Sequence, residues 1–407
     1  MAFLRGVCVK NKNEFLIISG NAISHFGDVI FTFGLNWWIV SITGNAKLLG
    51  IITTVSLIPS IFTNLFGGVI SDRFNKKKIL IYTDIVSSIA CFLLAFYSSQ
   101  SYINIPLIII VNVILGICFS LFSPAARSIV PEIINKERVR NVNSLLSSIN
   151  ETIKIGSPLI GGFILSLSFI DIKTFFIING ISFLISGISE IFITYPQKTK
   201  KTQASFIKDF MDGFKYVRRN SILFRLLIVI SLVNFFLAGY NVLLPALVHE
   251  EFSKSYIYSF LLSSEAIGGI LGALLLSRKK DSIPELKAIR KELLYCGSVF
   301  LILFISLKLF TLIPVLFLFG FFLTRFNILF FTYIQTNIDE SVLGRVFSFI
   351  FTTAVLLMPL GSFLFGYLIN IPLTYIFPLV GVGISLSIIL INESFPKVLY
   401  KENETDI

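Results

Sequence analysis

The sequence predicts an all-α membrane protein in which twelve transmembrane helices form two pseudo-symmetric bundles of six. Of its 407 residues, 55% are hydrophobic and only 14% are charged, whereas soluble domains carry about 25% charged residues. The hydrophobic residues gather into runs of the length that crosses a bilayer, roughly 20 residues. The longest polar stretch lies near the middle of the chain and separates six runs from six others, which predicts two halves of similar build.

The twelve expected spans follow one another with short connections. They are residues 14–41, 47–70, 79–99, 104–128, 142–168, 173–194, 223–247, 256–277, 293–309, 311–335, 344–368 and 372–392. Only a few residues around Lys308 and Thr311 separate the ninth span from the tenth. A tight hairpin is expected there, because a single helix of that length would exceed the thickness of the bilayer. The first run is too long for a cleavable signal peptide, so it is expected to be a span.

These spans divide the chain into four parts. The parts are an N-terminal six-helix bundle over residues 1–194, a cytoplasmic linker over 195–222, a C-terminal six-helix bundle over 223–392 and a cytoplasmic tail over 393–407. One helical face of the linker is apolar, and its residues are Phe206, Phe210, Phe214 and Val217. This spacing predicts an amphipathic helix on the inner leaflet that connects the two bundles.

Lysine and arginine lie mainly on one side of the predicted membrane. With the N-terminus in the cytoplasm, most of the 34 basic residues fall in cytoplasmic segments. The outer loops hold four, which are Lys47, Lys173, Lys254 and Lys308. Cytoplasmic loops are typically enriched in these residue types. The pattern therefore predicts a multi-pass protein with both termini in the cytoplasm.

Composition and motifs exclude several classes. The net charge of +11 does not indicate nucleic-acid binding, because the charges lie in short runs between apolar stretches. The four cysteines form no CxxC pair and the histidines number only two, so no metal site or cofactor is expected. No nucleotide-binding loop, HExxH or GxSxG motif occurs, so the chain is not expected to be an enzyme. The expected partners are membrane lipids and a small-molecule substrate, with the protein acting as a monomer.

The connection between the second and third spans carries the string Gly68-Val-Ile-Ser-Asp72-Arg73-Phe-Asn75-Lys76-Lys77. Gly68 and Asp72 are four residues apart and share a helix face. The glycine allows a neighbouring helix to approach, and Asp72 then faces that helix. The string resembles the GxxxD(R/K)xG(R/K)(R/K) signature of the major facilitator superfamily, with Asn75 in place of a glycine. Because asparagine tolerates the left-handed backbone conformation, the turn is expected to be kept.

This resemblance implies a conformational latch that holds the two halves together in the outward-facing state. Its residues would be Gly68, Asp72, Arg73, Lys76, Lys77 and, at the start of the eleventh span, Arg345. The alternative is a plain basic loop of the cytoplasmic side.

The fifth span contains Gly156-Ser157-Pro158-Leu-Ile-Gly161-Gly162. Pro158 removes a backbone hydrogen bond and predicts a kink. Gly156, Gly161 and Gly162 allow close packing beside it. The string resembles the GPxxGG element of superfamily exporters that exchange drug for proton, with Ser157 in place of a glycine. The alternative is a packing helix with no part in coupling.

Shorter strings extend the resemblance along most of the chain. They are Ser24-His-Phe-Gly27-Asp28, Thr43-Gly44-Asn-Ala46, Ser182-Phe-Leu-Ile-Ser186 and Gly344-Arg345-Val-Phe-Ser348. In their order and spacing they are similar to the macrolide-efflux branch of the superfamily, which also contains siderophore-exporter relatives. The resemblance implies export of small amphipathic compounds across a bacterial cytoplasmic membrane, driven by the proton gradient. A lysophospholipid flippase or a nutrient or metabolite permease on the same scaffold are the alternatives.

Ionisable residues inside the spans are candidates for proton coupling. Each costs roughly 2.5–3.5 kcal/mol on insertion scales, so such residues usually line a cavity or pair with each other. The resemblance places the first, fourth, seventh and tenth spans around a central cavity, where Asp28 and Arg325 would face the same space from opposite halves. Asp28 could then load a proton outside and release it inside, and a permanent ion pair or a backbone cap is the alternative.

Two further carboxylates are candidates. Glu265 in the eighth span has no cation within one helical turn, which predicts a protonation site or a carboxylate that reaches water near the interface. Glu151 lies three residues from Lys154, so the two are expected to neutralise each other on one helix face, with proton coupling as the alternative.

The central cavity is expected to present polar and aromatic side chains from the same four spans. These candidates are Asn36, Trp37, Asn112, Asn234, Tyr240 and Asn327. A mainly apolar cavity with a few polar points would suit bulky amphipathic compounds.

Overall fold

The computed structural model describes residues 11–98, 104–167, 171–195, 214–277, 285–338 and 340–390. All regular elements in these ranges are helices. The first group consists of α1 (Lys12–Thr43), α2 (Ala46–Arg73), α3 (Lys76–Tyr97), α4 (Ile105–Ile133), α5 (Lys136–Ser166) and α6 (Lys173–Ile191). The all-helical fold predicted from the sequence is therefore confirmed.

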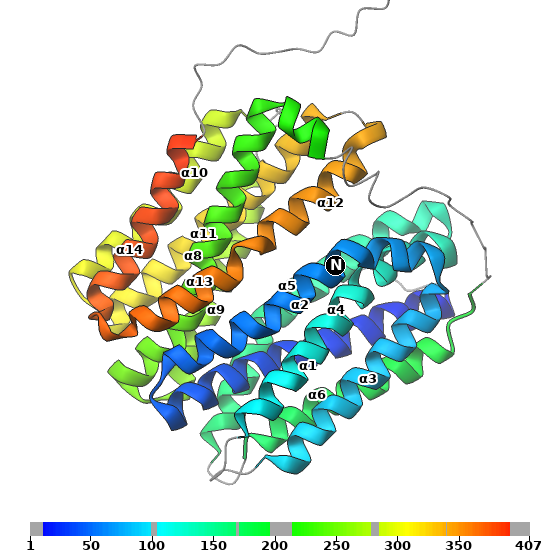
Figure 1. The fold of residues 1–407 in the computed structure, drawn as a ribbon, viewed down its shortest axis with the longest axis horizontal. Coiled ribbons are helices and arrows are strands. Elements are labelled where there is room, and N and C mark those ends of the chain that lie inside the picture. The colour runs from blue at the N-terminus through cyan, green and yellow to red at the C-terminus, as the bar shows by residue number, and fades with distance from the viewer. Residues whose placement is uncertain are drawn as a thin grey trace, which may run out of the picture.

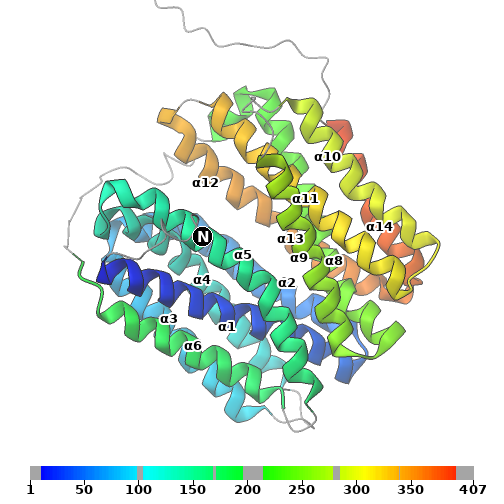
Figure 2. The same cartoon turned by 180° about the vertical axis from the view of Figure 1, so that it is seen from behind.

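The second group begins at Ser221. It consists of α8 (Ser221–Phe252), α9 (Ser255–Ser277), α10 (Leu286–Ser298), η1 (Val299–Phe304), α11 (Leu309–Asn337), α12 (Glu340–Leu356), α13 (Met358–Tyr367), η2 (Leu368–Asn370), α14 (Leu373–Leu386) and η3 (Ser387–Leu390). Figures 1 and 2 show α1–α6 as one bundle and α8–α14 as a second bundle beside it.

Within the described ranges, ten helices are long and apolar enough to cross a membrane. The other two expected spans, the fifth and the ninth, are present as helices of different character. The fifth is α5, whose first half is polar, and the ninth is α10 continued by the 3-10 helix η1. The hairpin expected around Lys308 is confirmed, because η1 ends at Phe304 and α11 begins at Leu309.

The expected eleventh span is broken. It consists of α12 and α13, which meet at Leu357. Pro359 lies in the first turn of α13. A proline has no N–H to donate to the carbonyl four residues earlier, so it favours the start of a new helix at this point.

Asparagine side chains begin several helices. Asn45, Asn75, Asn104 and Asn220 each accept a hydrogen bond from a backbone N–H in the first turn of the helix that follows. Such caps satisfy amides that have no partner within the helix. At Asn75 the backbone is extended, with φ −66° and ψ 110°, so the left-handed turn expected there is wrong. Asparagine keeps the connection by capping α3 instead.

Large apolar side chains cover the outside of both bundles. Among the exposed ones are Phe62, Phe96, Phe163, Ile305 and Phe310. Exposed apolar surface on this scale is stable when it faces lipid rather than water.

Residues 214–220 of the linker pack on the second bundle. Phe214 lies against the ring of Phe349 in α12, with centroids 5.6 Å apart, and Val217 is fully buried. These two residues therefore face protein instead of the membrane surface that was expected. Phe206 and Phe210, like the tail 393–407, lie outside the described residues.

The two bundles contact each other around the C-terminal half of α1. The ring of Trp37 lies against His249 of α8 and Tyr258 of α9, with centroids 6.0 and 6.1 Å apart. Phe33, one turn earlier, stacks on Tyr258 at 5.0 Å. Aromatic rings pack in these geometries with a gain beyond simple burial.

Two hydrogen bonds join the bundles at the same end of the molecule. Thr54 in the first half of α2 donates to the Pro359 carbonyl at 3.0 Å. Ser263 of α9 donates to the Ile155 carbonyl in the second half of α5 at 3.3 Å. These elements all contribute the ends that the sequence places on the outer side of the membrane.

Candidate functional site

Asp28 lies in α1 and faces α6. The side-chain amide of Asn179 donates to Asp28 Oδ1 at 3.4 Å. Asn179 is itself fully buried. A carboxylate in this position has a neutral partner, so the hydrogen bond does not compensate its charge.

Arg325 has a partner inside its own bundle. Its Nη2 lies 2.5 Å from Oε1 of Glu292 in α10. The expectation that Arg325 and Asp28 face each other across the bundles is therefore wrong in this conformation. The rotation of a helix about its axis cannot be determined from one sequence, and Glu292 lay just before the expected ninth span.

Glu265 of α9 points into the second bundle. Tyr240 of α8 donates its hydroxyl to Glu265 Oε2 at 2.6 Å. The Tyr240 ring is fully buried among the rings of Phe300, Phe319 and Phe377. Tyr240 was expected to line a central cavity, and the structure places it in the bundle interior as the partner of Glu265 instead.

The other expected cavity residues lie in α1, α4, α8 and α11. Asn112 and Asn234 each donate to a carbonyl of their own helix, at 2.9 and 2.8 Å, and Asn327 is half-buried in α11. Asn36 lies beside the hydroxyl of Tyr258, and Trp37 lies at the contact between the bundles. Asn36 and Trp37 therefore lie at that contact.

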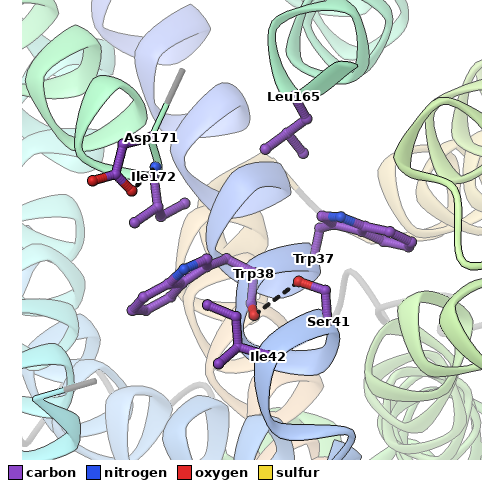
Figure 3. A pocket seen from close by; sticks show the side chains of 7 residues that line it. All are labelled: Trp37, Trp38, Ser41, Ile42, Leu165, Asp171 and Ile172. Carbon is purple, nitrogen blue, oxygen red and sulfur yellow. Dashed lines mark hydrogen bonds between the residues drawn. The ribbon is translucent and has the colours of Figure 1, made fainter. Parts of the chain in front are cut away.

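A pocket of about 290 Å³ lies at the end of α1 (Figure 3). Its walls are Trp37, Trp38, Ser41, Ile42, Leu165, Asp171 and Ile172. The two indoles point to different sides of α1, and Ser41 donates to the Trp38 carbonyl at 3.1 Å. The pocket is at the end of the first bundle where α1 ends and α6 begins, so it is separate from Asp28.

The lysines of the expected latch bind within the first bundle. Lys76 is buried, and its Nζ lies 2.7 Å from Glu132 Oε1 in α4. Lys77 donates to the Ile191 carbonyl at 2.7 Å. Glu132 also accepts a hydrogen bond of 2.6 Å from Tyr195, and partial burial together with this carboxylate raises the pKa of Tyr195.

The remaining latch candidates lie in α2 (Gly68, Asp72 and Arg73) and in α12 (Arg345). The side chains of Asp72, Arg73 and Arg345 lie outside the described residues, as do the surroundings of Gly68 and the side chain of Glu151. Lys154, the expected partner of Glu151, is exposed on α5.

The glycines of α5 differ in their surroundings. Gly161 packs on the Phe33 ring of α1, and Gly162 packs on Ser259 of α9, where an added Cβ would overlap the serine side chain. A Cβ on Gly156 would meet no atom within 4 Å. Gly161 and Gly162 therefore form the close approach of α5 to α1 and to the second bundle, while α5 continues as a helix through Pro158.

Several buried ionisable groups were not among the sequence candidates. They are Glu14, which pairs with Arg138 at 2.9 Å, Asp84, Glu190 and Glu292. Asp84 and Glu190 lay inside the expected spans 79–99 and 173–194. A search of those spans for every carboxylate would have found both.

Comparison with known proteins agrees with this fold. Residues 17–362 match the sequence profile of the Major Facilitator Superfamily. The chain is 25% identical over 366 residues to macrolide efflux protein A of Streptococcus pyogenes, covering 86% of this chain and 87% of that protein. It is 27% identical over 279 residues to the staphyloferrin A transporter of Staphylococcus aureus, covering 66% of each.

Among solved structures, the fold is similar to that of the nucleoside transporter NupG. The TM-score is 0.72 at 14% identity, covering 93% of this chain and 99% of that one. Since the sequence profile spans most of the chain, the protein is a multi-pass membrane transporter rather than an enzyme, and it belongs to the Major Facilitator Superfamily.

Proposed function

We propose that the protein exports small amphipathic compounds of macrolide or siderophore type in exchange for protons. The proposal is supported by two carboxylates, one in each bundle, each of which accepts a hydrogen bond from a neutral donor. Asp28 is held by Asn179 and Glu265 by Tyr240. In the part of the chain that the structure describes, no cation pairs with either carboxylate.

Asp28 and Glu265 are half-buried, and ionisation of a carboxylate that is partly withdrawn from water and has no cation beside it is costly. Such a group is stabilised by binding a proton. When the bundles rock and expose the carboxylate to water, hydration stabilises its ionised form and the proton is released. A group of this kind couples its proton to alternating access.

The direction and the cargo are supported by the relatives. One similar protein is named for macrolide efflux and another for transport of staphyloferrin A. Contacts between the bundles at the outer ends, around Trp37 and Tyr258, are those of a transporter closed to the outside. Such a state accepts its cargo from the cytoplasm.

We place the protein in a bacterial cytoplasmic membrane with both termini in the cytoplasm. The relatives are bacterial, and the basic residues lie mainly in the segments assigned to the inner side. A cytoplasmic position of the basic linker 195–222 follows from the same assignment.

Accumulation in cells tests the proposal. The protein is expressed in an efflux-deficient bacterium, and labelled macrolides and siderophores are measured with and without a proton uncoupler. We expect lower accumulation on expression and its recovery with the uncoupler. Glu265→Gln should abolish the uncoupler-sensitive part, because glutamine cannot exchange a proton.

The matched control is Glu251→Gln, since Glu251 is an exposed carboxylate at the end of α8. That variant should behave as the unaltered protein does. Accumulation that expression leaves unchanged for every macrolide and siderophore would refute the proposal.

A further inference from the structure

A buried polar stripe lies between α1, α3 and α6. The polar residues of α6 in this stripe recur every three or four positions, so they lie on one face of the helix. Its members are Asn179, Ser182, Ser186 and Glu190. The contribution of α3 is Thr83, Asp84, Ser87 and Ser88. All eight side chains are buried, although these helices belong to a membrane protein in which polar groups are costly.

Glycines hold the three helices close at this stripe. A Cβ on Gly20 of α1 would lie 3.3 Å from Ser186 Oγ, and one on Gly27 would lie 2.6 Å from Asn179 Oδ1. A Cβ on Gly187 of α6 would lie 3.3 Å from the Asp84 Cβ. Small residues allow such approach between helix backbones. The polar side chains are therefore enclosed by protein on all three helices.

Two acidic side chains in the stripe lack complete hydrogen bonding. Asp84 is 2% exposed and Glu190 is 1% exposed. Asp84 Oδ2, Glu190 Oε2 and the hydroxyl oxygen of Ser186 are buried without a hydrogen-bond partner. Ser186 lies beside Asp84. Most buried polar atoms in proteins have a partner, so three unpartnered oxygens along one stripe indicate a site that takes up a hydrogen-bonded species.

The groups that face Asp84 are acidic or neutral. They are Asp28 from α1, Cys118 from α4 and Glu190 from α6. On α3, two turns before Asp84, Lys77 donates to the carbonyl of Ile191. His25 stands three residues before Asp28 in α1. Carboxylates that share a site and have no cation between them cannot all be ionised.

The three carboxylates of Asp28, Asp84 and Glu190 lie at different depths in the membrane. At 1.5 Å per residue, Asp28 lies roughly 24 Å from the first residue of α1 and Asp84 roughly 12 Å from the first residue of α3. Both helices begin on the side assigned to the cytoplasm. Glu190 is the last residue but one of α6, at the same side. The order from the cytoplasm inward is therefore Glu190, Asp84 and Asp28.

We infer that Glu190 and Asp84 relay protons between Asp28 and the cytoplasm along the α1–α3–α6 interface. The inference rests on the proposed function, because it supplies the inner route for the proton that Asp28 releases. In each step the O–H bond of one carboxyl breaks as an O–H bond forms on the next carboxylate, directly or through a serine hydroxyl. One proton leaves Asp28 and one enters cytoplasmic water from Glu190, and no other bond changes.

Reconstituted vesicles separate a relay from a structural role. Purified protein is placed in liposomes, and labelled macrolide transport is measured under an imposed pH gradient. Exchange of labelled for unlabelled macrolide is measured without a gradient, since exchange needs no net proton movement. In Asp84→Asn and Glu190→Gln, we expect gradient-driven transport to fall by at least about tenfold. Exchange should stay close to that of the unaltered protein, and Asp84→Glu should recover part of the gradient-driven rate.

The matched control is Glu251→Gln on α8, an exposed carboxylate, which should leave gradient-driven transport intact. Gradient-driven transport that survives in both relay variants would overturn the inference. Loss of exchange together with gradient-driven transport would assign these residues a structural role and would also overturn it.

If the unaltered protein neither transports nor exchanges macrolide, the proposed function fails. A second measurement then tests the relay by itself. Infrared spectra of the same protein should contain protonated carboxyl bands that disappear in Asp84→Asn and Glu190→Gln. On transfer to heavy water, the Asp84 band should exchange its proton at least about tenfold more slowly in Glu190→Gln. Absence of these bands, or an unchanged exchange rate, would exclude the relay.

Discussion

Arg325 illustrates at the residue scale how a charge is kept inside this protein. Its guanidinium pairs with Glu292 at 2.5 Å and lies 5.2 Å from the ring centroid of Phe321. Both members of the pair are largely removed from solvent. Loss of one member of a buried pair leaves the other charge uncompensated, which costs more than the pair itself contributes.

Arg325→Gln is therefore expected to lower the free energy of unfolding by about 3–5 kcal/mol. The double variant Arg325→Gln with Glu292→Gln should recover part of this loss, because it leaves no unpaired charge. Thermal unfolding of the detergent-solubilised protein measures both effects.

Arg219→Gln is the control for that series, since Arg219 is exposed. It should change the stability by no more than about 0.5 kcal/mol. Equal midpoints for Arg325→Gln and Arg219→Gln would show that the pair does not stabilise the packing of α10 on α11.

The sequence indicates which residues are ionisable within the spans but not which way they face. Asp28, Glu265 and Arg325 could be selected because each interrupts an apolar run. Their partners Asn179, Tyr240 and Glu292 come from other helices. Such pairings depend on helix rotation and tilt, which the packing of the whole bundle determines.

At the element scale, α5 contacts the second bundle through a glycine. Gly162 packs on Ser259 and on the backbone at Tyr256, both of α9. Gly156 lies six residues earlier, with open space around it. The same motif therefore contains one position that cannot accept a side chain and one that can.

Gly162→Val is expected to force α5 away from α9 and to open the contact between the bundles at the outer end. Overpacking of this kind costs about 1–3 kcal/mol, so the closed state should lose population and transport should fall. The distance between spin labels on the outer ends of α5 and α9 measures the opening.

Gly156→Val on the same helix is the matched control. It should leave the label distance and the transport rate close to those of the unaltered protein. Equal distances in the two variants would contradict the role of Gly162 as the close-approach position.

The existence and order of the helices follow from apolar run length, and their starts follow from asparagine caps such as Asn45 and Asn104. The break between α12 and α13 could be predicted only in part. Pro359 permits a helix to begin but does not require it, because neighbouring helices can also hold a proline within a continuous span.

At the scale of the whole molecule, each bundle contains a carboxylate whose hydrogen-bond partner is neutral. Asp28 lies between α1 and α6 of the first bundle, and Glu265 lies between α8 and α9 of the second. The contacts around Trp37 join the bundles near the end of α1. Rocking about these contacts would change the surroundings of both carboxylates in one motion, which is the physical basis proposed for coupling export to protons.

Proton movement driven by the cargo tests this coupling most directly. Vesicles that contain the purified protein and an enclosed pH indicator receive a macrolide gradient with no pH gradient at the start. We expect macrolide flow to drive protons in the opposite direction, and Asp28→Asn and Glu265→Gln to abolish the resulting pH change. Macrolide flow through the protein without a pH change, or a pH change that persists in both variants, would rule out proton-coupled export by these carboxylates.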